Sequence, residues 1–244
     1  SSLIPTVSRS FSGGDKGDVN SKISMVIRFA TIVSFPCAIG LAVVSVPVMG
    51  ILFNSADDAV LASYLMIIGS AVVVLYSIST VTNAILQGTN LINKPVKNAA
   101  ISLVIHFIVL YILLFAFKSN VIGLVFGNMV FALSMCILNA RSIKKNLYYR
   151  QEVIKTFLMP FICAGIMGIA VYMAYAGLRM FTQSRALLTM IPVAVGVPVY
   201  AILLIGTRTI SKNEILQMPK GKKLVSILPV SYTHLRAHET DSYL

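Results

Sequence analysis

The sequence predicts an all-α, polytopic membrane protein that crosses the bilayer with six helices. Of its 244 residues, 57% are hydrophobic and only 11% are charged, and the mean hydropathy is +0.86. Soluble domains average about 45–50% apolar and about 25% charged residues, so a water-soluble fold is not expected. The apolar residues also form solid runs, whereas the strands of a membrane β-barrel show a weak alternation over about ten residues.

Six uncharged apolar runs give the chain this character. A helix needs about 20 mainly apolar residues to cross the hydrocarbon core. Backbone polar groups in lipid have no water to bind, so each run is expected to be helical. In chain order, the expected spans are residues 29–53, 59–87, 98–117, 121–140, 156–178 and 186–206.

Prolines lie inside three of these spans. Pro36 and Pro47 interrupt the first span, Pro160 lies near the start of the fifth, and Pro192 and Pro198 lie in the sixth. A proline frees a backbone carbonyl and favours a kink. Broken helices in transporters often line a cavity or act as hinges. Prolines are also common in membrane helices generally, so both interpretations of Pro36 and Pro47 stay open.

The basic residues predict the orientation. Sixteen lie in the leading segment and in alternate gaps between spans, whereas the other gaps hold Lys118, Arg179 and Arg185 together with Asp57 and Asp58. Cytoplasmic loops carry an excess of Lys and Arg, so both ends of the chain are expected in the cytoplasm. Nucleic acid is not an expected partner despite the net charge of +12, because binding it requires a continuous accessible basic patch.

A few polar side chains in or beside the spans are candidates for function. His106, in the middle of the third span, is either a neutral side chain hydrogen-bonded to a neighbouring helix or part of a proton relay. Asn83, Gln87 and Asn90, near the end of the second span, could bind sugar hydroxyls or cap the helix end. The Gly123-x-x-x-Gly127 pattern allows close helix approach, within the protein or in a dimer.

The chain lacks the usual signatures of a membrane enzyme. The three cysteines lie inside apolar runs, where they are expected to be small buried side chains rather than disulfides or metal ligands. A membrane transferase that uses a metal with a pyrophosphate should carry recurring acidic clusters, but Asp57 and Asp58 are a single pair in a short loop. No enzymatic activity, cofactor or metal is therefore expected.

Several motifs resemble one membrane family. The sequence LIPTVS at 3–8 is followed by a polar loop and then by FPCAIGL at 35–41, with Pro47 beyond it. A second set is AILQG at 84–88, followed by KPV at 94–96. Their order and spacing resemble the second half of the polysaccharide and lipid-linked-precursor flippases of the MOP superfamily, which includes the lipid II flippases and the stage V sporulation protein B type.

The resemblance implies part of a transporter with two six-helix lobes around a cleft and two added C-terminal helices. Residues 1–10 would end a preceding helix, 11–140 would complete the second lobe with four spans, and 141–206 would form a basic loop and the added pair. Residues 207–229 would be a basic cytoplasmic tail. Arg9 and Arg28 would be cations at the mouth of the cleft or cytoplasmic anchors.

The implied function is translocation of a lipid-linked oligosaccharide or peptidoglycan precursor across the bacterial cytoplasmic membrane by alternating access. The implied partners are membrane lipid and a polyprenyl-pyrophosphate saccharide, and coupling to an ion is left open. On this interpretation the chain is expected to be inactive alone, because half of the cleft is absent. The alternatives are a multidrug exporter of the same superfamily, a membrane-embedded glycosyl- or prenyltransferase, and a non-catalytic membrane subunit.

The last fifteen residues differ in character from the rest. They are polar and carry two of the three histidines, His234 and His238. Residues 230–240, VSYTHLRAHET, are similar to a translated transposon-based sequencing adapter over eleven consecutive positions. Residues 230–244 are therefore expected to be an artefact, and the two histidines are not expected to bind metal.

Overall fold

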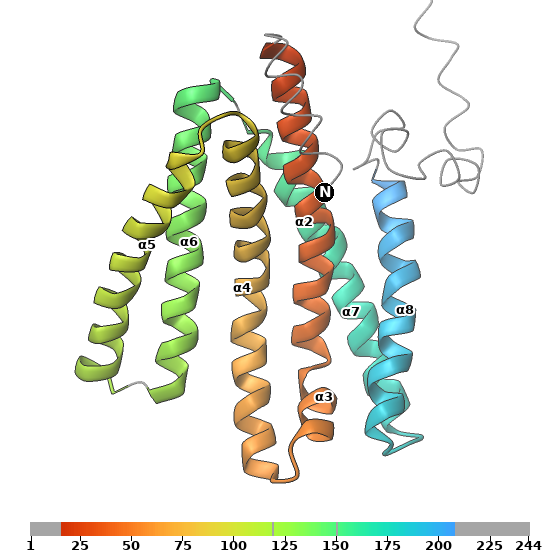
Figure 1. Cartoon of the computed structure of the whole chain (residues 1–244). Coiled ribbons are helices and arrows are strands. Elements are labelled where there is room, and N and C mark those ends of the chain that lie inside the picture. The colour runs from red at the N-terminus through yellow and green to blue at the C-terminus, as the bar shows by residue number, and fades with distance from the viewer. Residues whose placement is uncertain (1–15, 119, 150, 208–244) are drawn as a thin grey trace, which may run out of the picture.

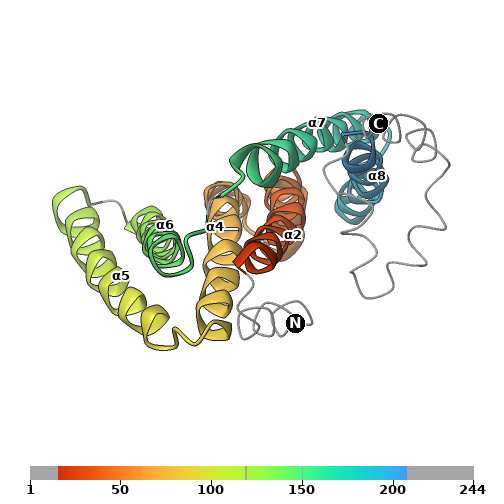
Figure 2. The same cartoon turned by 90° about the horizontal axis from the view of Figure 1, so that it is seen from above.

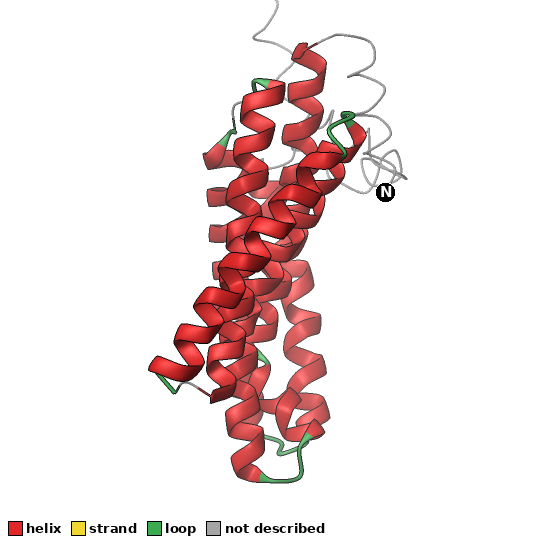
Figure 3. Cartoon of the chain, turned by 60° about the vertical axis from the view of Figure 1, so that its left-hand side comes forward, coloured by secondary structure: helices red, strands yellow, loops and turns green. Residues whose placement is uncertain are grey.

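The computed structural model describes residues 16–118, 120–149 and 151–207, and this part of the chain contains helices and short connections without strands (Figures 1 and 3). The elements are α2 (Lys16–Val43), α3 (Ser45–Leu52), α4 (Ala56–Gly88), α5 (Asn93–Tyr111) with the π-helical turn η1 (Ile112–Ala116), α6 (Asn120–Leu147), the π-helical turn η2 (Ile154–Leu158), α7 (Met159–Arg179) and α8 (Arg185–Gly206). The expectations for residues 1–10 and 230–244 lie outside the described residues.

Within the described residues, six helical segments are long and apolar enough to cross a membrane, which confirms the expected number and order of spans. They are Val19–Val43, Ala56–Gly88, Asn93–Ala116, Asn120–Leu147, Ile154–Arg179 and Arg185–Gly206. The bounds of the first span were predicted wrongly. Its long helix begins at Lys16 and ends at Val43, because the charged residues before 29 are helical and the chain breaks before residue 53.

The break between α2 and α3 has a local cause in Pro47. This residue is the third of α3 and has no N–H to donate to Val43 O, and its ring would clash with that carbonyl. The helix is accordingly interrupted at Val44, where ψ is 10°. Pro36, by contrast, lies inside the continuous helix α2.

The helices stand side by side in a curved row. Seen from above, the row runs from α5 through α6, α4 and α2 to α7 and α8 (Figure 2). Two cores hold it together. One, formed by α2, α4, α6 and Tyr149, contains Val19, Ile23, Val26, Ile27, Ile85, Leu86, Ile143, Leu147 and Tyr149. The other, formed by α2, α7 and α8, contains Ile32, Val44, Cys163, Ala164, Met167, Val171, Tyr200 and Leu204.

The two ends of the bundle differ in charge. At the upper end in Figure 1, called the basic end below, lie Lys22, Lys94, Lys97, Arg141, Lys144, Lys145 and Lys155. The opposite end carries Asp57, Asp58, Lys118, Arg179 and Arg185. The charge asymmetry expected from the sequence is therefore an asymmetry between the two ends of the folded bundle.

Candidate functional site

A buried polar cluster joins α4, α5 and α6. Asn139 of α6 is fully buried, and its Nδ2 donates to Asn83 Oδ1 at 2.8 Å and to Thr82 Oγ1 at 3.0 Å. Asn98 of α5 donates from Nδ2 to Asn139 Oδ1 at 2.8 Å and to Ser142 Oγ at 3.1 Å. Amide groups away from water must find such partners, so the cluster fixes the relative register of the three helices. Asn83 thus lies in a helix contact.

A second group of polar side chains lies on an open face of α4. A hollow of about 510 Å³ runs along this helix, lined by Gly69, Val72, Val73, Tyr76, Ser77, Thr80 and Val81. Gln87 lies seven residues beyond Thr80 on the same face, and both side chains are exposed. An amide that faced lipid would lack hydrogen-bond partners. The hollow itself is mainly apolar, so Ser77, Thr80 and Gln87 are isolated polar groups along this face.

Asn90 ends α4. Its φ of 62° is left-handed, a conformation that asparagine tolerates better than most residues. Its N–H donates to Gln87 O at 3.3 Å, and the Leu91 N–H donates to Leu86 O at 2.9 Å. These two bonds form a Schellman helix ending, so the backbone of Asn90 caps the helix. Its exposed side chain stays a candidate for substrate contact.

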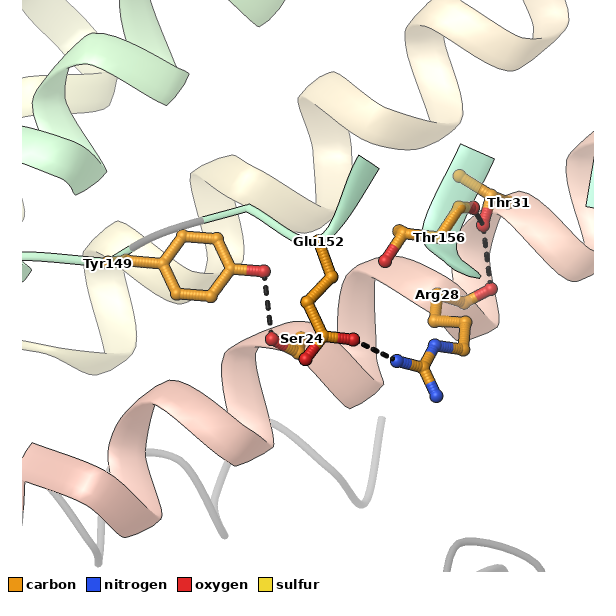
Figure 4. Close-up of polar contacts among 6 residues, drawn as sticks. All are labelled: Ser24, Arg28, Thr31, Tyr149, Glu152 and Thr156. Carbon is orange, nitrogen blue, oxygen red and sulfur yellow. Dashed lines mark hydrogen bonds and ion pairs between the residues drawn. The ribbon is translucent and has the colours of Figure 1, made fainter. Parts of the chain in front are cut away.

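At the basic end, Arg28 of α2 contacts the segment that leads into α7 (Figure 4). Its Nη2 lies 3.0 Å from Glu152 Oε2, and its side chain is only 10% exposed whereas that of Glu152 is 56% exposed. One turn earlier, Ser24 Oγ lies 3.0 Å from the hydroxyl of Tyr149. Burial raises the pKa of Tyr149 above its ordinary value of 10.0, and the hydrogen bond to Ser24 opposes this rise.

A third contact in the same region depends on a proline. Thr31 Oγ1 donates to Thr156 O at 2.6 Å and also lies 2.8 Å from Arg28 O of its own helix. In an α-helix Thr156 O would accept from residue 160, but Pro160 has no N–H. Thr156 also lies in the π-helical turn η2, and its carbonyl accepts from the hydroxyl of Thr31 on the neighbouring helix.

His106 lies between α5 and α6. Its Nδ1 is 2.8 Å from Gly127 O, and because a carbonyl only accepts, Nδ1 carries the hydrogen. A Cβ placed on Gly127 would lie 3.2 Å from His106 Cε1. The ring also packs edge-on against Phe131. The glycine pattern thus permits a close contact within the chain. His106 has the hydrogen bond to a neighbouring helix that was the first of its two interpretations.

Comparison with known proteins identifies the family. The family model described as "Lipid II flippase MurJ" matches residues 1–197. The chain belongs to the MurJ lipid II flippase family. The lipid II flippase MurJ of Bacillus subtilis (strain 168) is 25% identical over 206 residues, which cover 81% of this chain and 38% of that protein. The chain therefore spans well under half the length of this curated relative.

Membership of the MurJ family confirms the superfamily resemblance carried by the motifs at 3–8, 35–41, 84–88 and 94–96. Together with the six apolar helices, it makes the chain a multi-pass protein of the bacterial cytoplasmic membrane. Among the described residues, no group of three or more His, Cys, Asp or Glu side chains could hold a metal ion.

Sequence reasoning missed part of this arrangement. Asn98 and Asn139 were not singled out, although an asparagine inside an apolar span is itself a signal of interhelical hydrogen bonding. The hydroxyl of Thr31 gave no such signal, because its acceptor is a backbone carbonyl. Of the predicted candidates, Asn83 and His106 lie in helix contacts, Arg28 faces Glu152, and Gln87 is exposed. Arg9 lies outside the described residues.

Proposed function

We propose that this chain forms part of a flippase that carries lipid II, the lipid-linked peptidoglycan precursor, across the cytoplasmic membrane without altering it chemically. The observation that carries the proposal, beside family membership, is the open face of α4, where a hollow of about 510 Å³ with mainly apolar walls contains Ser77 and Thr80. A sugar-pyrophosphate headgroup cannot cross hydrocarbon unaided, because its charges and hydroxyls would lose their water. Ser77, Thr80 and Gln87 would offer it hydrogen bonds on the way.

The curved row of helices supports a division into two walls. Helices α2 to α6 would form one wall of the cleft, and an opposing wall would be needed to enclose the headgroup because the face of α4 is uncovered. Rocking of the two walls would expose the cleft to each side in turn. We propose that the helix break at Val44, next to Pro47, is one hinge for this motion. Pro36, inside the continuous helix α2, would be a weaker bend.

The charge asymmetry supports a proposal for the orientation of the chain in the membrane. We propose that the basic end faces the cytoplasm, as positively charged loops generally do. A membrane potential would then drive any net charge moved in the cycle, by about 2.3 kcal/mol per elementary charge per 100 mV. Single cysteines at Lys118 and Lys145, in a chain without the native cysteines, would test this orientation. A membrane-impermeant maleimide added to whole cells should label only position 118.

Translocation itself can be tested in sealed vesicles. The complete gene product would be reconstituted with a fluorescent lipid II analogue, and transfer between leaflets would be followed by reduction of the exposed dye. Gln87→Leu should slow transfer about tenfold, the cost of one hydrogen bond to a charged or polar group. The matched control, Asn93→Leu, removes an exposed amide at the start of α5 and should stay within about twofold. No transfer by the unaltered protein, with export of a cationic dye instead, would favour the multidrug exporter.

A further inference from the structure

The end of the bundle opposite the basic end contains a cavity of about 720 Å³. It lies between α3 and the start of α4 on one side and the connection between α7 and α8 on the other. Valine, proline, alanine and leucine side chains of α3, α4 and α8 form its apolar wall. Its polar lining consists of Tyr64, Tyr175, Arg179, Gln183 and Arg185, together with Ser63.

Both arginines of this end of the bundle, in the part of the chain that the structure describes, line this one cavity. Arg185 donates from Nη1 to Gly50 O in the last turn of α3, which places its guanidinium against the cavity wall. The guanidinium of Arg179 has no hydrogen bond or ion pair within the described residues, and no described carboxylate lies within ion-pair distance of either guanidinium. The cavity therefore contains two positive charges that no carboxylate in the described part of the protein neutralises.

The depth of the cavity matches that of lipid headgroups. Arg179 is the last residue of one candidate span and Arg185 is the first residue of the next. Both guanidinium groups thus lie where the hydrocarbon core gives way to the interface. A guanidinium binds phosphate oxygens with two parallel hydrogen bonds, and the amide of Gln183 can donate a further one. The apolar wall suits the glycerol and upper acyl chain of the same molecule.

We propose that this cavity binds the phosphate group of an anionic lipid at the membrane surface opposite the basic end. The site is separate from the open face of α4, and binding there does not require that the protein translocate anything. Arg179 supplies the principal contact, and Arg185, fixed by Gly50, supplies the second cation. The inference thus goes beyond the proposed transport function and can fail independently of it.

The absence of tryptophan from the chain provides a clean reporter. Val60 lines the cavity and is 56% exposed, so Val60→Trp would place one indole at its wall. The whole chain would be placed in phosphatidylcholine nanodiscs that contain dibrominated phosphatidylglycerol, which quenches a nearby indole. Arg179→Gln should weaken phosphatidylglycerol binding about tenfold, as expected for loss of a charge-assisted hydrogen bond. Lys118→Gln, which removes the third cation of the same end from outside the cavity, should change it less than twofold.

Three further measurements complete the test. Native mass spectrometry of the chain without the tryptophan should show the same loss of bound phosphatidylglycerol in Arg179→Gln. Inorganic phosphate at millimolar concentration should not restore the fluorescence, and a polyprenyl pyrophosphate should compete with phosphatidylglycerol. Equal losses in the Arg179 and Lys118 variants would overturn the proposal, because they would show only attraction to surface charge. Displacement by inorganic phosphate would overturn it in favour of a site for free anions.

Discussion

The two helix pairs that flank α2 and α4 are attached by different chemistry. The pair α5–α6 is joined to α4 through side-chain amides, with Asn139 of α6 bonded to three residues of α4 and to Asn98 of α5. The pair α7–α8 is joined to α2 through hydroxyl groups that donate to backbone carbonyls: Thr31 to Thr156 O at 2.6 Å, and Tyr200 to Ile32 O at 2.7 Å. In the second arrangement Gly168 of α7 also lies close to Ile39 of α2.

The difference concerns what each attachment requires. An amide cluster requires a matching side chain on every helix, and each unpaired member in the interior is costly. A hydroxyl that donates to a carbonyl requires only one side chain, because every backbone provides the acceptor. The α7–α8 pair depends instead on shape, since a Cβ on Gly168 would lie 2.5 Å from Ile39 Cγ2. We infer that α5–α6 is fixed by polar pairing and α7–α8 by close packing.

The largest effect is expected at the amide cluster. Asn139→Ala removes the central amide and leaves the groups of Asn83 and Asn98 that faced it without that partner. We expect the free energy of unfolding to fall by about 3 kcal/mol, measured by titration with SDS in detergent micelles. The control Asn128→Ala removes an exposed amide from the same helix and should change it by less than about 0.5 kcal/mol. Equal losses in both variants would refute the importance of the cluster.

A smaller loss is expected where α7 meets α2. Gly168→Ala places a methyl group against Ile39, whose branched side chain must rotate about χ1 or shift with its backbone to make room. The cost should be about 2 kcal/mol, in the range of overpacked cores. Gly165→Ala is the matched control on the same helix, because nothing lies within 4 Å of its Cβ position. That variant should be neutral or slightly stabilised, since alanine favours helix. If Gly168→Ala behaves in the same way, shape is not what holds the pair.

The ion pair at the basic end should contribute less. A double-mutant cycle of Arg28→Gln and Glu152→Gln should give a coupling energy of about 1 kcal/mol or less, because Glu152 is mostly exposed. High salt should reduce this coupling, as it does for exposed charges. A coupling that is absent at low salt would show that the pair does not contribute to holding α7 against α2.

The smallest effect is a pH dependence at Tyr149. Because burial raises its pKa in the folded protein, the folded state retains a proton that the unfolded state loses above the ordinary value of 10.0. Stability is therefore present below this pH and falls as the pH rises through the shifted pKa. Between about pH 9 and pH 11, Tyr149→Phe should lose less stability than the unaltered protein. Parallel pH profiles of the two proteins would count against this effect.

The sequence predicted the spans better than their contacts. Six runs of apolar residues are enough to define six helices, since only helices and closed barrels satisfy a backbone in lipid and solid apolar runs do not match barrel strands. Hydropathy does not predict that α2 begins at Lys16, because polar residues can extend a helix beyond the hydrocarbon. It also does not predict the end at Val43, because the break depends on Pro47 and not on polarity. His106 and Asn83 were recognised as unusual, but their partners Gly127 and Asn139 lie 21 and 56 residues away and depend on how the helices pack.

The bond between Thr31 and Thr156 O has a genetic consequence. Its acceptor is a backbone atom, so no side-chain replacement at position 156 deletes that atom, whereas Thr31→Val removes the donor. Pro160→Ala would supply a backbone N–H at position 160 that could donate to this carbonyl. A screen for suppressors of Thr31→Val should therefore recover changes at residue 160 rather than at residue 156, although the bond that was lost ended on residue 156.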